Sequence, residues 1–309
     1  YQENKFNLNK EKVAIIGQGN VAIDVTRILA KTEQELSTSD ITENALSQLK
    51  NSSIKEIHLI GRRGPAQAAF TELEIKELGE LEDCDIVINT KDLELGEACK
   101  KEAEESNKSK KNIAILNNLC EKENSNKSKK IILHFLKSPL EITGESNVTG
   151  LTLEKNQLSG EAGSQKARGT GETEELACDL VFRSIGYKGV PISQVPFDEQ
   201  KGIIPNEKGR VQNGSSELTR LYVSGWIKRG ATGVLGTNKP DSKETIDTLI
   251  EDLPQLNQSK HRSSDDLKAL LNNRNVRIIS FEDWKKIDDE ETKRGQEKNK
   301  PREKFTSTE

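Results

Sequence analysis

The first hydrophobic pattern in the chain predicts a strand, a tight turn and a helix in direct succession. Residues 12–16 form a β-branched run that ends at a glycine, which is typical of a buried parallel strand. From Asn20 to Leu29, apolar residues recur at spacings that suit a helix packed on a sheet. Between the two lies the GxGxxA sequence of residues 17–22.

The hydrophobic pattern also predicts a second strand and two further helices. Residues 56–60 read as a strand that ends in Gly-Arg-Arg-Gly-Pro. The two helices are expected over 39–46 and 71–78, each opened by a capping box, Asp40 with Glu43 and Thr71 with Glu74. This alternation predicts an α/β fold with a parallel, Rossmann-like sheet.

The rest of the chain has weaker patterns. Residues 94–130 are rich in Lys, Glu, Asn and Ser and predict a solvated helix and loop. Three strands are expected over 131–144, 147–158 and 175–187, with a Gly-rich hairpin tip at 159–172. A glycine cluster at 224–236 precedes a helix expected to start near Asp241, and the stretch from Glu290 reads as a frayed, solvated tail.

Composition excludes several classes of protein. Charged and hydrophobic residues each make up 32% of the chain and the net charge is -4, which argues against a nucleic-acid partner. No apolar run is long enough to span a membrane. The four cysteines form no CxxC pair, so we expect reduced thiols. The three histidines have no metal-ligand spacing, and no metal site is expected.

The glycine turn is a candidate site for a dinucleotide pyrophosphate. Gly17 and Gly19 would let the backbone approach the phosphates, and the following helix presents free N–H groups at its N-terminus. A ligand-free strand–helix turn is the alternative. The flanking strand and helix favour the nucleotide site, because they supply the context that gives this motif its meaning.

The kind of nucleotide is decided at the end of the second strand. An NAD site needs an acid there, whereas an NADP site needs arginine for the 2′-phosphate. Asp40 lies at about the customary distance from the glycines but opens a helix. Arg62 and Arg63 close the strand itself, and paired guanidiniums suit a phosphate, so the sequence favours NADP over a solvated arginine pair.

Five segments together resemble the adrenodoxin reductase family of NADPH-dependent, FAD-containing ferredoxin reductases. They are GQGNVAIDVTRIL, DITENAL, GRRGPAQAAFTELEIKEL, RSIGYKG and GWIKRGATGVLGTNK. The last is most similar to the bacterial ferredoxin-NADP reductases. The resemblance runs from about Lys12 to Lys304. It implies an NADP-binding domain inserted in a split FAD-binding domain.

The resemblance also implies roles for individual residues. Gly17 is a candidate from the turn itself, and those matching NADP contacts of the family are Gln18, Gly19, Asn20, Val21, Arg62, Arg63 and Glu74. Glu77 matches the carboxylate near the nicotinamide, and a solvated helix carboxylate is an equal alternative for it. For Glu74, a capping role is an equal alternative to the NADP contact. Those matching FAD contacts are Trp226, Gly233, Val234 and Leu235. Without the family, Trp226 would read as a core aromatic.

The sequence departs from the family at its start. No GxGPAG-type FAD turn precedes the NADP segment, and the chain contains no methionine, so we expect a fragment whose N-terminal FAD segment is missing. The remaining domains would be 1–185, binding NADP, and 186–309, the C-terminal part of the FAD domain with a charged tail.

The expected activity is hydride transfer from NADPH to FAD, then single-electron transfer to a ferredoxin or adrenodoxin-like protein. Lys228 and Arg229 are candidate charges for steering an acidic partner. A monomer is expected, in a bacterial cytoplasm or alternatively a mitochondrial matrix. The alternatives are an NADP-binding chain without flavin activity and a disulfide-reductase relative, although the latter needs a CxxC pair.

Overall fold

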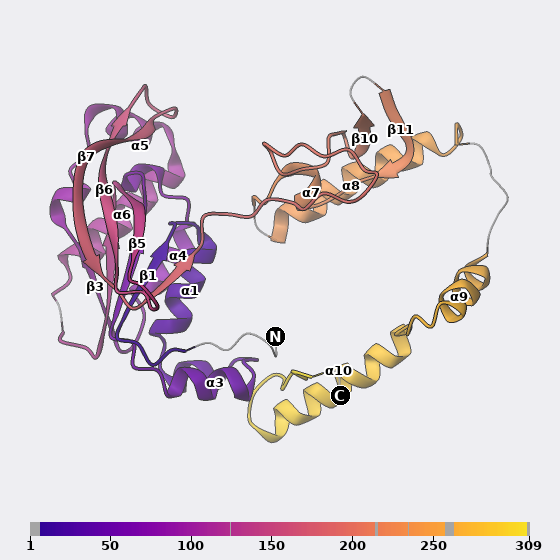
Figure 1. Ribbon diagram of the computed structural model, residues 1–309, viewed down its shortest axis with the longest axis horizontal. Helices are drawn as coiled ribbons and strands as arrows, with labels where there is room; N and C mark the ends of the chain where they lie inside the picture. The colour runs from indigo at the N-terminus through magenta and orange to yellow at the C-terminus, as the bar shows by residue number, and fades with distance from the viewer. Residues whose placement is uncertain (1–6, 124, 214–215, 234, 257–262, 308–309) are drawn as a thin grey trace. The chain divides into compact units, whose positions relative to one another are not determined.

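The computed structural model describes residues 7–123, 125–213, 216–233, 235–256 and 263–307. The chain divides into two compact units (Figure 1). The first unit contains Tyr1–Ile185 and Ser280–Glu309, and the second contains Gly186–Ile279. The first part of the first unit ends at residue 185, and residues 280–309 belong to the first unit and not to the second.

The first unit is built on a parallel sheet with the strand order β3-β4-β2-β1-β8. Its strands are β1 (Lys12–Ile16), β2 (Glu56–Ile60), β3 (Cys84–Ile88), β4 (Lys129–His134) and β8 (Leu180–Arg183). Ile16 lies opposite Ile60, so β1 and β2 end at the same edge of the sheet. The strands expected at 12–16 and 56–60 are confirmed, while β3 was not expected.

Helices cover one face of this sheet. Val13, Ile15, Ile57 and Leu59 alternate toward that face and are completely buried. The helices packed on them are α1 (Asn20–Ala30), α4 (Glu72–Leu78) and α6 (Asn107–Glu121). The remaining helices of residues 7–123 are α2 (Glu33–Ser37), α3 (Glu43–Lys50), η1 (Pro65–Gln67), η2 (Thr90–Leu93) and α5 (Glu97–Glu105). The segment expected to be solvated therefore supplies α6 to the core.

An antiparallel sheet covers the other face, in the order β5-β6-β7. Its strands are β5 (Lys137–Thr143), β6 (Gly150–Ser159) and β7 (Lys166–Ala177). Ala14 of β1 packs in one cluster with Leu151 and Leu153 of β6. The single strand expected over 131–144 is wrong, because the chain leaves the parallel sheet at Leu136, whose φ is 54°. The expected hairpin tip is likewise too long, since β7 already begins at Lys166.

The C-terminal end of the first unit is ordered rather than frayed. It consists of helix α10 (Phe281–Glu297) followed by residues 298–307. We call residues 298–307 the C-terminal arm. Lys300 Nζ donates to the Ile41 carbonyl at 2.7 Å, and Lys304 Nζ lies 2.6 Å from Asp40 Oδ2. Asp40 therefore does not cap α3. Thr42 does, accepting the Ala45 N–H at its side-chain oxygen.

The described residues of the second unit form a small sheet and three helices. They are β9 (Asn206–Glu207), β10 (Arg210–Asn213), β11 (Ser216–Tyr222), α7 (Trp226–Arg229), α8 (Leu235–Asp252) and α9 (Ser264–Asn273). Its core is centred on Ile204, Val211 and Val223. Helix α8 begins at Leu235, so the helix start expected near Asp241 was wrong. In the described parts of both units, no helix combines the length and apolar character needed to cross a membrane.

Two histidines form a hydrogen bond between the neighbouring strands β2 and β4 of the first unit. Lys137 Nζ lies 3.4 Å from His134 Nδ1, and His134 Nε2 lies 3.0 Å from His58 Nδ1. Since an ammonium only donates, His134 carries its proton on Nε2 and donates it to His58. Burial lowers the pKa of His58, and burial followed by the Lys137 charge lowers the pKa of His134 to about 3. Both rings are therefore held neutral by the fold.

This pair makes stability depend on pH in a defined direction. A histidine whose pKa is lowered by folding stabilises the protein fully above its unfolded pKa, about 6.5. That contribution is lost progressively as the pH falls from 6.5 toward 3. We expect the melting temperature of the chain to fall by several degrees between pH 7 and pH 5, measured by circular dichroism. In His134→Gln the fall should be shallower, and an identical slope would contradict the assignment.

Candidate functional site

Gly17 fixes the tight turn between β1 and α1. Its φ is 122°, a conformation that strongly favours glycine. A Cβ added there would lie 2.1 Å from the Ser184 carbonyl oxygen, so the backbone of residue 184 occupies the space of a side chain. The Gly17 N–H donates to the Ile60 carbonyl at 2.8 Å. This glycine therefore serves the packing of the strand ends.

Gly19, unlike Gly17, has open space where a side chain would lie. A Cβ added there would meet nothing closer than the Ala69 Cβ, 4.0 Å away. Gly19 is the N-cap of α1, and no side chain of the described residues accepts a hydrogen bond at this end of the helix. The first N–H groups of a helix need acceptors that the helix cannot supply, and an anion can fill that role. The open backbone at Gly19 thus fits a pyrophosphate.

Gln18 turns its side chain into the protein. Its Nε2 donates to the His134 carbonyl at 2.9 Å, and only 8% of the residue is exposed. A Cβ on Gly61 would lie 2.0 Å from Gln18 Oε1, so Gly61 is needed for this side chain to pass. The backbone carbonyl of Gln18 accepts the N–H groups of Ala69 and Phe70, both at 3.0 Å. Only the backbone of Gln18 is therefore available to a ligand.

Asn20 connects the turn to the helix that follows the second strand. Its Oδ1 accepts the Thr71 N–H at 2.8 Å. Thr71 is the N-cap of α4 but makes no side-chain cap bond, so the expected capping box with Glu74 is not formed. The next residue, Val21, is exposed in the first turn of α1. Residues 69–71 are thus bound to the glycine turn by three backbone N–H groups.

Arg62 and Arg63 follow β2 at the carboxyl end of the sheet. Both side chains are exposed, and neither forms an ion pair with any described residue. Their backbone is fixed, because Asn156 Nδ2 donates to the Arg62 carbonyl at 2.9 Å and the Leu136 N–H donates to the Arg63 carbonyl at 3.1 Å. Two guanidiniums that have no acidic partner among the described residues and that are carried on a fixed backbone suit a phosphate.

Glu74 and Glu77 lie one turn apart on α4 and share a cation from α1. Arg27 Nη1 lies 3.3 Å from Glu74 Oε2 and also pairs with Glu77 Oε2. Arg27 is one-fifth exposed, whereas the Glu77 side chain is half exposed. Sequence reasoning did not identify Arg27. Its position in the last turn of α1, opposite two acids, could have indicated it.

The residues matched to FAD contacts lie in the second unit. Trp226 is half exposed, and its ring stacks on Tyr187 with the centroids 6.0 Å apart. Gly233 has a φ of 88°, and a Cβ there would meet the Thr237 hydroxyl at 2.3 Å. Leu235 begins α8, while Val234 lies outside the described residues. An indole this exposed is unusual for a core aromatic, which was the alternative interpretation.

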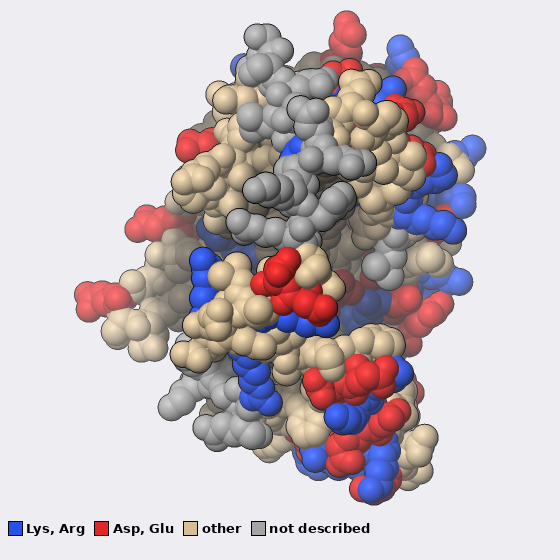
Figure 2. Space-filling view, turned by 90° about the vertical axis from the view of Figure 1, so that its right-hand side faces the viewer, with Lys and Arg blue, Asp and Glu red and all other residues tan. Residues whose placement is uncertain are grey.

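Lys228 is not a surface charge, which corrects the steering role expected for it. It is 7% exposed, and its Nζ lies 3.2 Å from Asp241 Oδ1 and 2.8 Å from Glu244 Oε2. Arg229 Nη2 donates to Asn238 Oδ1 at 2.7 Å. Both cations are therefore engaged within the second unit. On the face shown in Figure 2, acidic and basic side chains are interspersed.

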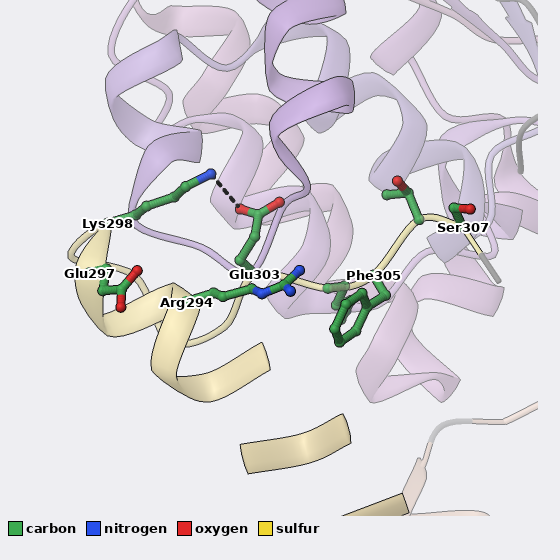
Figure 3. Close-up of a pocket in the computed structure, with 8 residues that line it drawn as sticks. Arg294, Glu297, Lys298, Glu303, Phe305 and Ser307 are labelled. Atoms are coloured by element: carbon green, nitrogen blue, oxygen red, sulfur yellow. Dashed lines mark ion pairs between the residues drawn. The ribbon is translucent and has the colours of Figure 1, made fainter. Parts of the chain in front are cut away.

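A cavity of about 350 Å³ lies at the C-terminal arm and not at the glycine turn. Figure 3 shows Lys298 paired with Glu303 at its wall. Arg294 pairs with Glu290 and packs over the Phe305 ring. Because the cations that line this cavity already have acidic partners, they offer no unpaired positive charge to an anionic ligand.

The parallel sheet, its open glycine turn and the arginine pair at the next strand end define a dinucleotide-binding α/β protein. A scan against protein-family profiles gives no match. The chain is 39% identical over 308 residues to the NADPH-ferredoxin reductase FprA of Mycobacterium tuberculosis, covering 97% of this chain and 66% of the relative. It is 38% identical over 314 residues to the mitochondrial NADPH:adrenodoxin oxidoreductase of Arabidopsis thaliana, covering 97% and 65%.

The solved structure of Mycobacterium tuberculosis FprA in complex with NADPH superposes with a TM-score of 0.89 at 40% identity. The superposition covers 97% of this chain and 66% of that one. The chain therefore belongs to the family of NADPH-ferredoxin and NADPH:adrenodoxin reductases, and its fold is that of these two-dinucleotide-binding-domain flavoproteins. It spans just under two thirds of the length of these relatives.

The contrast between the glycines gives a test of the site's framework. We expect Gly17→Ala to lower the free energy of unfolding by about 2 kcal/mol or more, because it combines a strained φ with a clash against backbone. Gly96→Ala is the matched control, since a Cβ there meets nothing within 4 Å. It should cost less than about 1 kcal/mol. Denaturant unfolding followed by circular dichroism measures both, and equal costs would contradict the packing role of Gly17.

Proposed function

We propose that this chain acts in the NADPH-dependent, FAD-containing reduction of a ferredoxin-type iron–sulfur protein. The observation that carries the proposal is the open glycine turn bonded directly to the loop that begins at Arg62 and Arg63. The names of the relatives support the same activity. The two alternatives have no comparable support, since the chain contains no CxxC pair and its relatives are reductases of ferredoxin or adrenodoxin.

The nucleotide would bind along the carboxyl edge of the parallel sheet. Its pyrophosphate would accept hydrogen bonds from the backbone at Gly19 and the first turn of α1, where no side chain competes. Its 2′-phosphate would be held by Arg62 and Arg63, which have no acidic partner among the described residues. The hydrogen bonds between the turn and residues 69–71 would keep these two subsites at a constant separation.

Glu77 would act at the nicotinamide end of the nucleotide, and Glu74 would contact the nucleotide one helical turn earlier. Both carboxylates face Arg27, which neutralises part of their charge and holds them on one side of α4. Carboxylates held this way could stabilise positive charge on the oxidised ring. This assignment follows the family resemblance and the shared cation.

FAD, when bound, supplies the step that accepts a hydride and passes single electrons onward. The residues that would lie against it are Trp226, Gly233, Val234 and Leu235. The half-exposed indole and the positive φ of Gly233 fit a ring that covers them. A visible flavin spectrum in the purified chain would separate this function from NADP binding without flavin. A colourless chain that still binds NADP⁺ would support the latter.

Selectivity between the two nicotinamide nucleotides tests the phosphate site. We expect Arg63→Ala to weaken NADP⁺ binding about tenfold or more, because a charge-assisted hydrogen bond to phosphate contributes roughly 1.5–3 kcal/mol. NAD⁺ binding should change less than about twofold, since NAD⁺ lacks that phosphate. Isothermal titration calorimetry measures both constants.

Arg168→Ala is the matched control for this substitution. Arg168 is exposed on β7 of the same unit and forms no ion pair with any described residue. Its removal lowers the net charge by the same amount and should leave both constants unchanged. Equal losses of NADP⁺ and NAD⁺ affinity in Arg63→Ala would overturn the assignment of the arginine pair.

The proposed partner is an acidic ferredoxin or adrenodoxin-like protein, in a bacterial cytoplasm. Since Lys228 is buried, steering must come from exposed cations on a chain whose net charge is -4. We expect the rate of ferredoxin reduction by the flavin-loaded protein to fall as salt rises from about 0.01 to 0.15 M, because the Debye length shrinks from roughly 30 to 8 Å. A rate that does not respond to salt would argue against electrostatic steering.

A further inference from the structure

A lysine outside the predicted site contacts the loop that begins with the arginine pair. Lys108 belongs to the first turn of α6, and its Nζ donates to the Ala69 carbonyl at 2.8 Å. The Ala69 N–H in turn donates to the Gln18 carbonyl at 3.0 Å. Lys108 is thus attached, through one residue, to both the loop that starts at Arg62 and the glycine turn.

The charges of Lys108 and Arg63 also interact. Burial lowers the pKa of Lys108, and the positive charge of Arg63 lowers it further. Among the described residues, no acid forms an ion pair with Lys108, Arg62 or Arg63. One turn along the same helix the situation differs, because Lys111 Nζ lies 2.8 Å from Glu72 Oε2.

The hydrogen bonding of Lys108 leaves capacity for a ligand. An ammonium has three N–H donors, and the Ala69 carbonyl accepts one of them. The other donors have no acceptor among the contacts of the described residues. Fixed cations gathered without an acid repel one another, and a bound anion removes that repulsion.

We propose that Lys108 is a third cation of the 2′-phosphate site and contributes to the selectivity for NADP(H) over NAD(H). This inference rests on the proposed function, since it needs the phosphate to lie at Arg62 and Arg63. The ammonium would add a point charge beside the two forked guanidiniums, with its stem anchored on Ala69. The ligand is a 2′-phosphorylated adenine dinucleotide.

A purely structural lysine that only binds the Ala69 carbonyl is the competing explanation. Lys108→Gln separates the two roles, because the glutamine amide is still a hydrogen-bond donor but has no charge. Lys111→Gln is the matched control on the same helix, and it removes an equal charge from a lysine already paired with Glu72.

The test is calorimetric binding of NADP⁺ and NAD⁺ to the complete chain. Lys108→Gln should weaken NADP⁺ about threefold to tenfold, as expected for one partly exposed charge–phosphate contact, and leave NAD⁺ unchanged. Lys108→Arg should retain most of the NADP⁺ affinity, and Lys111→Gln should retain all of it. An unchanged NADP⁺ constant in Lys108→Gln, or equal losses of both nucleotides, would overturn the proposal.

The outcome also separates this inference from the proposed function. If the unmodified chain shows no preference for NADP⁺, the proposed function fails and Lys108 loses its role with it. If the chain prefers NADP⁺ and Arg63→Ala removes that preference while Lys108→Gln does not, only the third cation is refuted.

Discussion

The site depends on three hydrogen bonds that backbone N–H groups of the loop after the second strand donate to the glycine turn. The Gln18 carbonyl accepts the N–H groups of Ala69 and Phe70, and Asn20 Oδ1 accepts that of Thr71. The loop carries the arginine pair at its start and the acidic helix α4 at its end. The bond to Asn20 is half-buried, and the three bonds together fix the end of the loop relative to the open backbone of Gly19. The geometry that favours a dinucleotide therefore belongs to the first unit alone.

Much of this framework could be predicted from local sequence. The strands at 12–16 and 56–60 are short apolar runs that end in glycine, and α1 shows the periodicity of a helix packed on one face. The arginine pair followed directly from its position at a strand end. These features could be predicted from the sequence because each depends on residues that are neighbours along the chain.

The features that were missed depend on contacts between distant residues. Strand β3 lies at the sheet edge, and its pairing with β4 gives no local signal. The C-terminal arm looks solvated in sequence, yet its lysines bind residues 40–43 of the same unit. Lys228 looked like a surface charge, but its partner Asp241 lies on another helix. Charge alone therefore does not show whether a side chain faces solvent or a buried acid.

A crystal structure of the chain grown with NADP⁺ tests the central claim most directly. The account predicts the pyrophosphate against the backbone of Gly19 and the first turn of α1, with the 2′-phosphate bonded to Arg62 and Arg63. A nucleotide bound elsewhere, or one whose 2′-phosphate points away from both guanidiniums, would contradict it.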